Sequence, residues 1–571
     1  MTINIKKVFK EKGQNWLIIQ LAALFLILPQ WFSRSVIFGS DILFHFNRFY
    51  DIAQQIENQN FQYFMSQYGF QQSGRMVNAL YGPLIAYFQG FLVWLSSSWF
   101  SYQVLSNLIL FTLAGQSMYF LLKRCTVDRK KALYLSLIYL TTFNILYWVT
   151  RQGFTSWGAA VFPLCLLPII ELYEKNRFNV VQIGFLMALM FQIHLFSAVL
   201  LAIIYLICYG FVFVKEKKGR KRLFLQGFLS VVFFFLLTTN VWYGLLTVYR
   251  GNEILSPFVN QTMYKNTITF NSSYWLVTPG ILLLFIIYFL RKSVKEWQLL
   301  PFFDQAITSI AIFFLVLSTN LIPWFFLGEQ HWKVIEVIQF PFRFFVPFTI
   351  LLFVFISRNG RWMVKERDQT VSFLKIATLL ALFQALVTMS VACVVWHVAE
   401  QPIQGSRHTY LYSEEIEELK ASFFNQDKSK TLSLIQKSTP DYLPIYEENP
   451  LNKYDQYKSL VINQNESDDF KKEVVNGELN VTWEAKPGEE VLVPVIIYER
   501  TKVRFNQQEM AHKRLHLTDI GTPKLISKAG TNTLVISYES SKGFTWSLLL
   551  PISTLILLVG YQWMRKKEAV S

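Results

Sequence analysis

Long apolar runs separated by short polar segments fill most of the chain. Runs such as residues 132–149, 198–214 and 230–246 approach or exceed the roughly 20 residues that a helix needs to cross a bilayer, and a helix satisfies its own backbone hydrogen bonds in lipid. The pattern predicts about twelve membrane-spanning helices, at residues 15–33, 102–122, 132–149, 158–173, 179–193, 196–214, 223–243, 275–290, 301–321, 342–357, 374–396 and 544–563. The run over 179–214 is too long for one span, and polar Gln192 and His194 interrupt it, so we expect two helices that turn near His194.

Two longer polar segments interrupt the helices. In residues 34–101, an amphipathic stretch at 41–55 precedes an apolar patch at 80–95, which we interpret as an interfacial or partly inserted helix. Residues 397–543 read as a soluble domain, with a helical pattern around 413–424 followed by alternating strand patterns. The strands are predicted at 479–483, 491–498, 503–505 and 533–538, with turn signals at Lys486-Pro487-Gly488 and Ala529-Gly530, which favours a small β-sandwich.

The expected fold class is therefore mainly α: a polytopic membrane bundle with a β-rich domain before the last transmembrane helix. We divide the chain into a transmembrane region with a large first exterior loop, an extracytoplasmic β-sandwich domain, and a last helix with a basic cytoplasmic tail. These parts cover residues 1–396 (loop 34–101), 397–543 and 544–571.

Composition agrees with this membrane assignment. Hydrophobic residues make up 53% of the chain and charged residues 16%, and the mean hydropathy is +0.30, which is too apolar for several soluble domains. All four cysteines fall in or beside predicted spans, so the exterior domain is expected to fold by packing without disulfides. The first apolar stretch has Pro29, Gln30 and Trp31 where a signal peptide would need small residues, so we expect it to be retained.

The net charge of +16 first suggests nucleic acid, but its distribution excludes that reading. Of the 54 Lys and Arg residues, 28 lie in seven short segments, eight in the four intervening segments and 18 between residues 396 and 543. This asymmetry is the positive-inside pattern. It predicts a multi-pass plasma-membrane protein with both termini in the cytoplasm and residues 397–543 outside, and the Phe and Lys richness suits a Gram-positive, low-GC bacterium.

The best candidate for chemistry is the segment Gly39 to Arg48, just beyond the outer end of the first helix. In a helix, Asp41, His45 and Arg48 fall at i, i+4 and i+7 on one face. The carboxylate can accept a proton from an acceptor hydroxyl or hold a divalent cation, and the guanidinium can clamp phosphate oxygens. The alternative is the polar face of an interfacial helix, with Arg48 reaching to the headgroups.

These residues resemble a known family. An Asp-x-x-x-His pattern in a long first exterior loop, ahead of many hydrophobic helices, resembles the GT-C superfamily of polyprenyl-phosphate-dependent glycosyltransferases. The segment Ile338-Gln339-Phe340-Pro341-Phe342-Arg343-Phe344 looks like the Gln-Phe-Pro-aromatic-Arg motif of the bacterial membrane family labelled 6-pyruvoyl-tetrahydropterin-synthase-related, close to the YfhO-like proteins. Tyr81-Gly82-Pro83-Leu84 resembles that family's Tyr-x-Pro-Leu element.

The resemblance implies a GT-C-like membrane fold and a glycosyltransferase that moves a sugar, with inversion or retention, from a polyprenyl-phosphate donor to a cell-envelope glycan, lipid or protein outside the cell. It carries the catalytic carboxylate to Asp41 and substrate contacts to His45, Arg48 and Arg343. Further candidate substrate contacts are Tyr81 and Gln339 in the two matching motifs, and His194 and His331 at predicted outer turns and loops. Because Asp41 is followed by Ile42 where GT-C enzymes often have a second acid, no metal ligand is assigned, and a divalent cation stays open.

For Arg343, His194 and His331 a structural role is the alternative to substrate contact. An arginine at the membrane-embedded start of a helix, as predicted for Arg343, needs a partner or water. A lipid phosphate would provide the partner, and snorkelling of the side chain to the interface would equally provide the water. His194 is open between substrate contact and packing, and His331 lies in a loop that serves equally well as a solvated connection. Rival functions are a transporter or flippase of lipid-linked saccharides and a non-enzymatic cell-envelope assembly partner.

Overall fold

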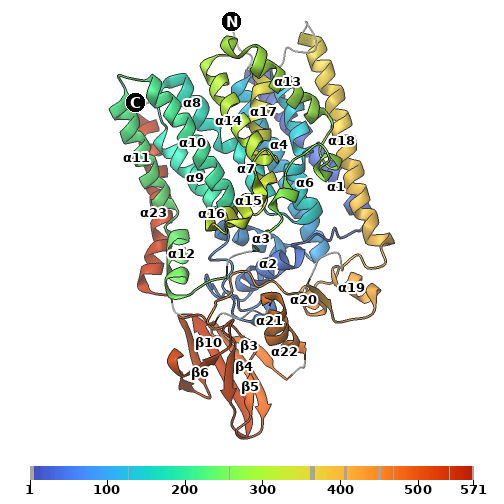
Figure 1. Cartoon of the computed structure of the whole chain (residues 1–571), viewed down its shortest axis with the longest axis vertical. Helices are drawn as coiled ribbons and strands as arrows, with labels where there is room; N and C mark the ends of the chain where they lie inside the picture. The colour runs from blue at the N-terminus through green and yellow to red at the C-terminus, as the bar shows by residue number, and fades with distance from the viewer. Residues whose placement is uncertain are drawn as a thin grey trace. The chain divides into compact units, whose positions relative to one another are not determined.

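The computed structural model describes residues 5–126, 128–255, 258–359, 367–403, 408–447, 452–466, 469–538 and 540–568. The chain packs as two compact units, each built from segments distant in sequence (Figure 1). The helical unit takes Met1–Gly39, Gln103–Phe234 and Val259–Pro402. The mixed unit takes Ser40–Tyr102, Phe235–Phe258 and Ile403–Ser571. Each is described below by itself.

The helical unit consists of helices that run side by side (Figure 1). Most predicted spans correspond to one helix or to two consecutive helices. They are α1 (Ile5–Ser33), α4 (Trp99–Cys125), α5 (Arg129–Leu140), α6 (Phe143–Arg151), α7 (Thr155–Cys165), α8 (Leu167–Lys175), α9 (Val180–Ile193), α10 (Leu195–Lys215), α11 (Arg220–Leu237), α13 (Ile281–Lys295), α14 (Phe302–Ser318), α15 (Trp324–Glu329), α16 (Lys333–Ile338), α17 (Phe345–Asn359) and α18 (Arg367–Val398).

Among the described residues, eight helices or continuous helix pairs are long and apolar enough to cross a membrane, and nine if α11 and α12 (Thr239–Gly251), which meet at 66°, form one span. These helices identify a membrane protein. Both α9 and α14, which were predicted as spans, fall below that length. The span expected at residues 275–290 begins as a helix only at Ile281, because Pro279 disfavours helical backbone in the residue before it.

The predicted turn near His194 is confirmed. Helix α9 ends at Ile193, and the His194 side chain caps α10 by accepting a hydrogen bond from the Ser197 backbone N–H. The turn fits closely against α7 because that helix has Gly158 there: a Cβ at Gly158 would lie 2.3 Å from Ser197 Oγ.

A ladder of neutral polar side chains joins α1 to α4 inside the helical unit. Its rungs are Asn15 Nδ2 to Tyr119 Oη (2.8 Å), Thr112 Oγ1 to Gln20 Oε1 (3.0 Å), Asn107 Nδ2 to Gln30 Oε1 (2.9 Å) and Gln30 Nε2 to Gln103 Oε1 (2.5 Å). In membrane helix pairs such contacts contribute about 0.6 kcal/mol each on average. The ladder therefore fixes the register of the first two long helices.

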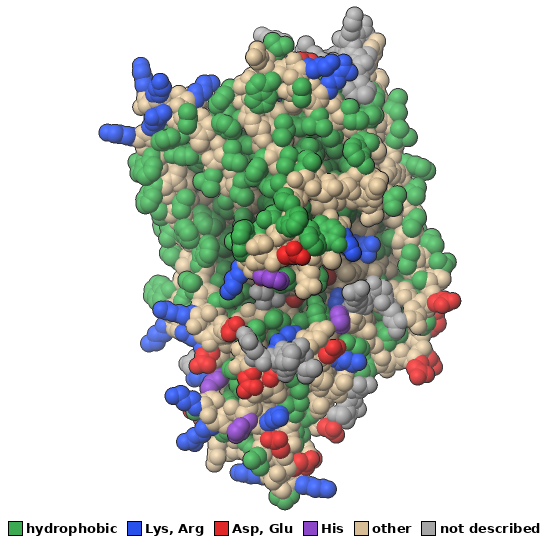
Figure 2. All heavy atoms as spheres, viewed as in Figure 1, with side chains coloured by type: hydrophobic (Ala, Val, Ile, Leu, Met, Phe, Trp, Pro, Cys, Tyr) green, Lys and Arg blue, Asp and Glu red, His purple; other side chains and the backbone are tan. Residues whose placement is uncertain are grey.

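Basic side chains gather at one end of the helical unit. Arg358, in the last turn of α17, pairs with Asp304 in the first turn of α14 (2.5 Å) and donates to the carbonyl of Cys125 at the end of α4 (3.5 Å). On the face that Figure 2 shows, hydrophobic side chains cover this unit and Lys and Arg side chains lie at its upper end. The ends of α4, α14 and α17 thus meet around Arg358.

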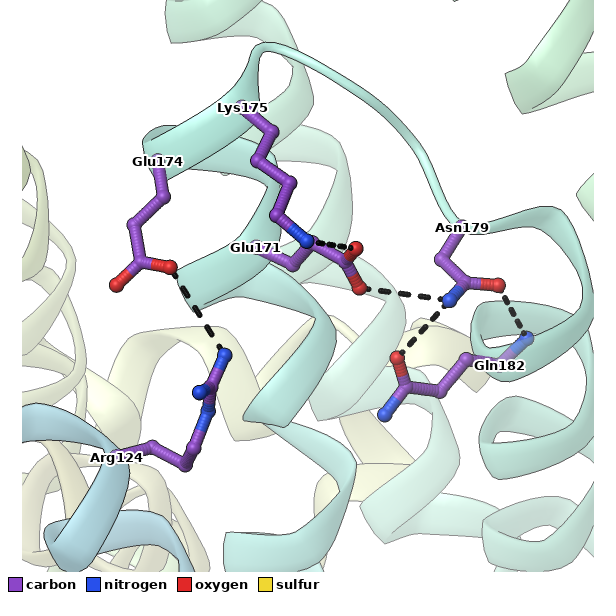
Figure 3. A network of polar contacts seen from close by, with 6 residues as sticks. All are labelled: Arg124, Glu171, Glu174, Lys175, Asn179 and Gln182. Carbon is purple, nitrogen blue, oxygen red and sulfur yellow. Dashed lines mark hydrogen bonds and ion pairs between the residues drawn. The ribbon is translucent and has the colours of Figure 1, made fainter. Parts of the chain in front are cut away.

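A polar network ties α4, α8 and α9 together at their ends (Figure 3). Arg124 lies 3.9 Å from Glu174, and Lys175 lies 2.9 Å from Glu171. Asn179 donates to Glu171 (3.4 Å) and caps α9. Arg124 and Glu174 are more than half exposed, so this pair holds the helix ends with little net energy.

The mixed unit combines the predicted first loop with the C-terminal part of the chain. Its helices are α2 (Ile42–Glu57), α3 (Pro83–Leu95), α12, α19 (Ile416–Ser422), α20 (Ser429–Leu434), α21 (Lys453–Tyr457), α22 (Asn463–Glu466) and α23 (Lys542–Glu568). Its strands are β1 (Thr409–Leu411), β2 (Ile435–Lys437), β3 (Lys471–Val475), β4 (Glu478–Ala485), β5 (Glu490–Leu492), β6 (Thr501–Phe505), β7 (Gln508–Glu509), β8 (His516–Leu517), β9 (Pro523–Ile526) and β10 (Gly530–Tyr538).

The strands form antiparallel sheets in the orders β1-β2, β3-β4-β10-β6-β7 and β5-β9-β8. Their register places apolar residues opposite one another: Leu534 pairs with Val481 and Ile536 with Leu479, and all four are buried. Of the strand expected at 491–498, only the beginning is extended as β5. Pro494 has no N–H to donate to a ladder, and the following residues are buried in irregular backbone.

The first loop and the strands share one hydrophobic core. Phe64 lies against the rings of Tyr538 (4.6 Å between centroids) and Phe544 (4.8 Å), and Leu479 and Ile536 belong to the same core. Helix α2 is buried on nearly all sides, with Phe46 stacked on Trp99 at 3.9 Å, so it is a core helix of the mixed unit and not the interfacial polar face considered above.

Helix α3 keeps an exposed apolar stripe. Leu84, Phe88, Phe91 and Leu95, at i, i+4, i+7 and i+11, are 38 to 55% exposed. A lipid surface would cover such a stripe, and the interfacial placement of this helix stays a prediction.

Candidate functional site

Asp41 lies immediately before the first turn of α2. Its backbone carbonyl accepts the hydrogen bond from His45 N (3.0 Å), while its side chain makes no capping bond. The side chain is partly exposed. The helix therefore places the Asp41 carboxylate at an open edge, with the buried His45 and Arg48 one and two turns further on.

Arg48 is fully buried in the mixed unit. Its Nε donates to Asn78 Oδ1 (3.1 Å), its Nη2 donates to the Tyr81 carbonyl, and its guanidinium lies 4.5 Å from the centroid of the Tyr81 ring. His45 Nδ1 lies 3.4 Å from Nη1. Burial lowers the pKa of Arg48 to about 10, so it stays cationic at neutral pH. His45, Arg48 and Tyr81, predicted separately from the loop, are thus brought together.

Three further charged residues lie near Asp41, and none was predicted from the sequence. Lys437, at the end of β2, donates to the Ser40 carbonyl. Asp441 follows four residues later and accepts a hydrogen bond from Phe258 N (3.2 Å). Arg75 donates from Nη2 to the Asp441 carbonyl (2.5 Å). We call Asp41, Arg48, Arg75, Lys437 and Asp441 the Asp41 cluster.

The charges of Asp41, Arg75, Lys437 and Asp441 act on one another. Burial raises the pKa of Asp441, the Asp41 charge acts in the same direction, and Arg75 opposes both. Burial lowers the pKa of Lys437, and Asp41 and Asp441 oppose this effect. The cluster contains three cationic side chains and two carboxyl groups, so it favours an anion.

A second group of predicted residues meets in the helical unit. Arg343 Nη1 donates to Gln339 Oε1 (2.9 Å) and to the Ile338 carbonyl (3.3 Å). The guanidinium lies 5.0 Å from the centroid of the Phe340 ring and 5.5 Å from that of Phe196. Gln339 has a left-handed φ of 57°, and Asn260 holds its carbonyl (2.8 Å). Gln339 and Arg343, four residues apart in the motif, therefore contact each other.

His194 is buried, and the charge of Arg343 acts on it. Burial lowers the pKa of His194 to about 3, and the charge of Arg343 acts in the same direction. Because Nδ1 accepts from Ser197 N (3.2 Å), the neutral ring carries its proton on Nε2. Its capping role is structural. We call His194, Gln339 and Arg343 the Arg343 cluster.

His331 does not join the Arg343 cluster by any contact seen in the described residues. Its side chain is 74% exposed and lies 3.9 Å from Glu336 Oε1. The described part of the chain contains no group of three His, Cys, Asp or Glu side chains arranged to hold a metal ion.

The Asp41 cluster belongs to the mixed unit and the Arg343 cluster to the helical unit.

The sequence analysis missed Lys437, Asp441 and Arg75 because these residues reach Asp41 only through folding, not through their spacing in the sequence. The one local signal is the turn-forming Ser438-Thr439-Pro440-Asp441 run after β2. No protein-family model matches the chain, and no curated protein is significantly similar to it.

Proposed function

We propose that the chain is a membrane glycosyltransferase that moves a sugar from a polyprenyl-phosphate donor to a hydroxyl of a cell-envelope acceptor outside the cell. In the proposed reaction, Asp41 takes the proton of the acceptor hydroxyl as its oxygen bonds to the anomeric carbon. The bond from that carbon to the phosphate breaks, and the lipid phosphate leaves with the electron pair.

The observation that carries the proposal is the Asp41 cluster. A partly exposed carboxylate stands beside Lys437 and shares its surroundings with the buried cations Arg48 and Arg75. A general base needs a carboxylate open to substrate, and an anionic donor needs fixed positive charge that a buried arginine supplies without reorganising. The cluster supports both requirements.

The Arg343 cluster supports the lipid half of the reaction. Arg343 follows Pro341 at the start of an apolar segment, Pro341–Asn359, that is long enough to span a membrane. Held by Gln339 and by two aromatic rings, its guanidinium is positioned to meet a phosphate at the bilayer surface.

The topology belongs to the same proposal. We place the basic end of the helical unit and both termini in the cytoplasm. Counting the α11–α12 pair as one span and adding α9, α13 and α14 brings the eight long apolar helices to the expected twelve. The sheets of the mixed unit then form an extracytoplasmic β-sandwich in a GT-C-like, YfhO-like protein of the plasma membrane.

Sugar transfer from a synthetic polyprenyl-phosphate donor by the purified full chain tests the proposal. We expect Asp41→Asn to lower kcat by on the order of 100-fold or more, as removal of a general base does. Asp455→Asn, which neutralises an exposed carboxylate of the same unit, serves as the matched control and retains parental rates. Equal rates for Asp41→Asn and the parent would remove Asp41 from the chemistry.

Arg343 separates donor binding from chemistry in the same assay. We expect Arg343→Gln to raise the KM for the donor by about tenfold through loss of one charge-assisted contact, and Arg343→Lys to recover part of it. An unchanged donor KM in both variants would contradict the lipid-phosphate role.

The α1 to α4 ladder is the one observation that favours a transporter, because a transport path needs polar groups along its helices. Proteoliposomes that move the labelled donor across the bilayer without extending an acceptor would replace the transferase proposal with this one.

A further inference from the structure

The C-terminal segment contributes a carboxyl group to the surroundings of Asp41. Asp441 lies in the sequence after β2, far from the first loop along the chain, yet its backbone carbonyl accepts from Arg75 of that loop (2.5 Å). Neither Asp41 nor Asp441 is a fully buried residue. Two carboxyl groups from different parts of the chain therefore lie in the same part of the mixed unit, close enough for the charge of Asp41 to act on Asp441.

Arg75 has hydrogen-bond donors that no protein group among the described residues uses. Its side chain is fully buried, lying 4.7 Å from the centroid of the Phe70 ring and 4.8 Å from that of Tyr457. Within the described residues, Nε and Nη1 have no hydrogen-bond partner. A buried cation with two unused donors is costly unless a ligand or water completes it.

Side chains near α21 interact with the same two carboxyl groups. Burial raises the pKa of Tyr454 to about 12, and the charges of Asp441 and Asp41 act in the same direction. His408 stacks on the Tyr454 ring at 4.1 Å. The charged side chains that act on Asp441 are Arg75, Asp41 and Lys437.

From this arrangement we infer that Asp441 is a second substrate-facing carboxyl group, which binds the hydroxyl groups of a glycan acceptor beside Asp41 while the buried Arg75 holds the Asp441 backbone in place. The inference rests on the proposed function and names its acceptor class. Carboxylates accept hydrogen bonds from sugar hydroxyls, so two carboxyl groups close together can accept from neighbouring hydroxyls of one polyol. The C-terminal segment then supplies part of the site itself.

Acceptor kinetics test the inference. Asp441→Asn keeps an oxygen to accept from Phe258 N while it removes the charge. We expect this variant to raise the KM for a glycan acceptor by about tenfold with kcat near the parental value, whereas Asp41→Asn lowers kcat. Parental acceptor KM in Asp441→Asn, in a preparation where Asp41→Asn is inactive, would overturn the inference and leave the proposed function standing.

A measurement of thermal stability needs no substrate, and it distinguishes failure of this inference from failure of the proposed function. Because burial and Asp41 disfavour the charged form of Asp441, Asp441→Asn is expected to raise the Tm near pH 7, and by less in an Asp41→Asn background. Equal increments in both backgrounds would show that the carboxyl groups are not neighbours and overturn the inference. Coupled increments in a protein that transfers no sugar would keep the pair and reject the transferase.

Asp441→Glu covers the case in which Asp441→Asn does not fold. It preserves the charge but shifts the carboxylate outward by roughly one methylene. We expect a raised acceptor KM and retained coupling to Asp41 in Tm. A parental acceptor KM would again count against a substrate-facing role.

Discussion

At the scale of residues, spacing predicted what lies on one face of a helix. The proximity of His45 to Arg48 follows from helical separation and is confirmed, whereas the contact between Gln339 and Arg343 was not predicted. Arg75, Lys437 and Asp441 could not be predicted from spacing either, because they lie 34, 396 and 400 residues from Asp41 and reach it only in the folded chain. The substrate roles of these residues stay predictions.

Asp51 gives the mixed unit a pH-dependent stability. Its side chain is 1% exposed and accepts hydrogen bonds from Tyr68 N (2.9 Å), Gly69 N (3.3 Å) and Gln55 Nε2 (2.9 Å). Burial raises its pKa from 3.8 to about 6 against these bonds. The folded state therefore binds the Asp51 proton more tightly than the unfolded chain does.

This contribution to stability is fully present below about pH 4 and is lost as the pH rises through about 6. A shift of about two pKa units corresponds to about 3 kcal/mol in the free energy of unfolding. We expect Asp51→Asn to flatten this part of the profile in thermal unfolding followed from pH 4 to pH 7. Asp455→Asn should reproduce the parental profile, and an equally steep profile in Asp51→Asn would contradict the assignment.

At the scale of elements, apolar periodicity located the helices and the strands β4, β6 and β10, because each buries a face that the sequence shows. The apolar periodicity located α2 but did not show that α2 is buried. A helix covered on both sides by other segments can keep polar residues that bond to one another, as Asp51 and Gln55 do, and these look like a solvent-facing side in the sequence. The periodicity extended β5 too far, because burial without a partner strand looks the same in sequence.

A left-handed turn in the first loop is bonded by one half-buried lysine. Phe70, Gln71 and Gln72 all have positive φ, between 50° and 57°, a conformation that costs energy in residues with a Cβ. Lys472 Nζ, on β3, donates to the carbonyls of Gln71 (2.8 Å), Gln72 (3.3 Å) and Pro494 (2.8 Å). The turn also sets the Phe70 ring against Arg75.

Lys472→Met keeps the apolar stem and removes the donors, which leaves three carbonyls without this partner. We expect it to lower the free energy of unfolding by about 3 kcal/mol, the scale of a buried polar group left unsatisfied. The neighbouring Lys471 is 76% exposed, and Lys471→Met should leave the Tm unchanged. Equal Tm values for the two variants would show that Lys472 does not hold the turn.

At the scale of the whole molecule, the charge pattern carries the topology. Basic residues at the ends of several helices lie at one end of the helical unit, and we expect them all to lie on one side of the membrane. Cysteine labelling in intact cells tests which side. In a background without the four native cysteines, we expect Glu484→Cys to react with an impermeant maleimide and Lys217→Cys to react only after lysis. Labelling of Lys217→Cys in intact cells would invert the topology.

The shared core of the first loop and the strands has a consequence for biosynthesis. Met76 N donates to Tyr498 Oη across 422 residues of chain, so the loop's burial waits for the C-terminal third of the protein. At roughly 5–20 residues per second, translation leaves Phe64, Met76 and their apolar neighbours without a core for tens of seconds. A ribosome that stops early therefore releases a membrane-inserted chain with an unfolded loop, a ready substrate for quality-control proteases.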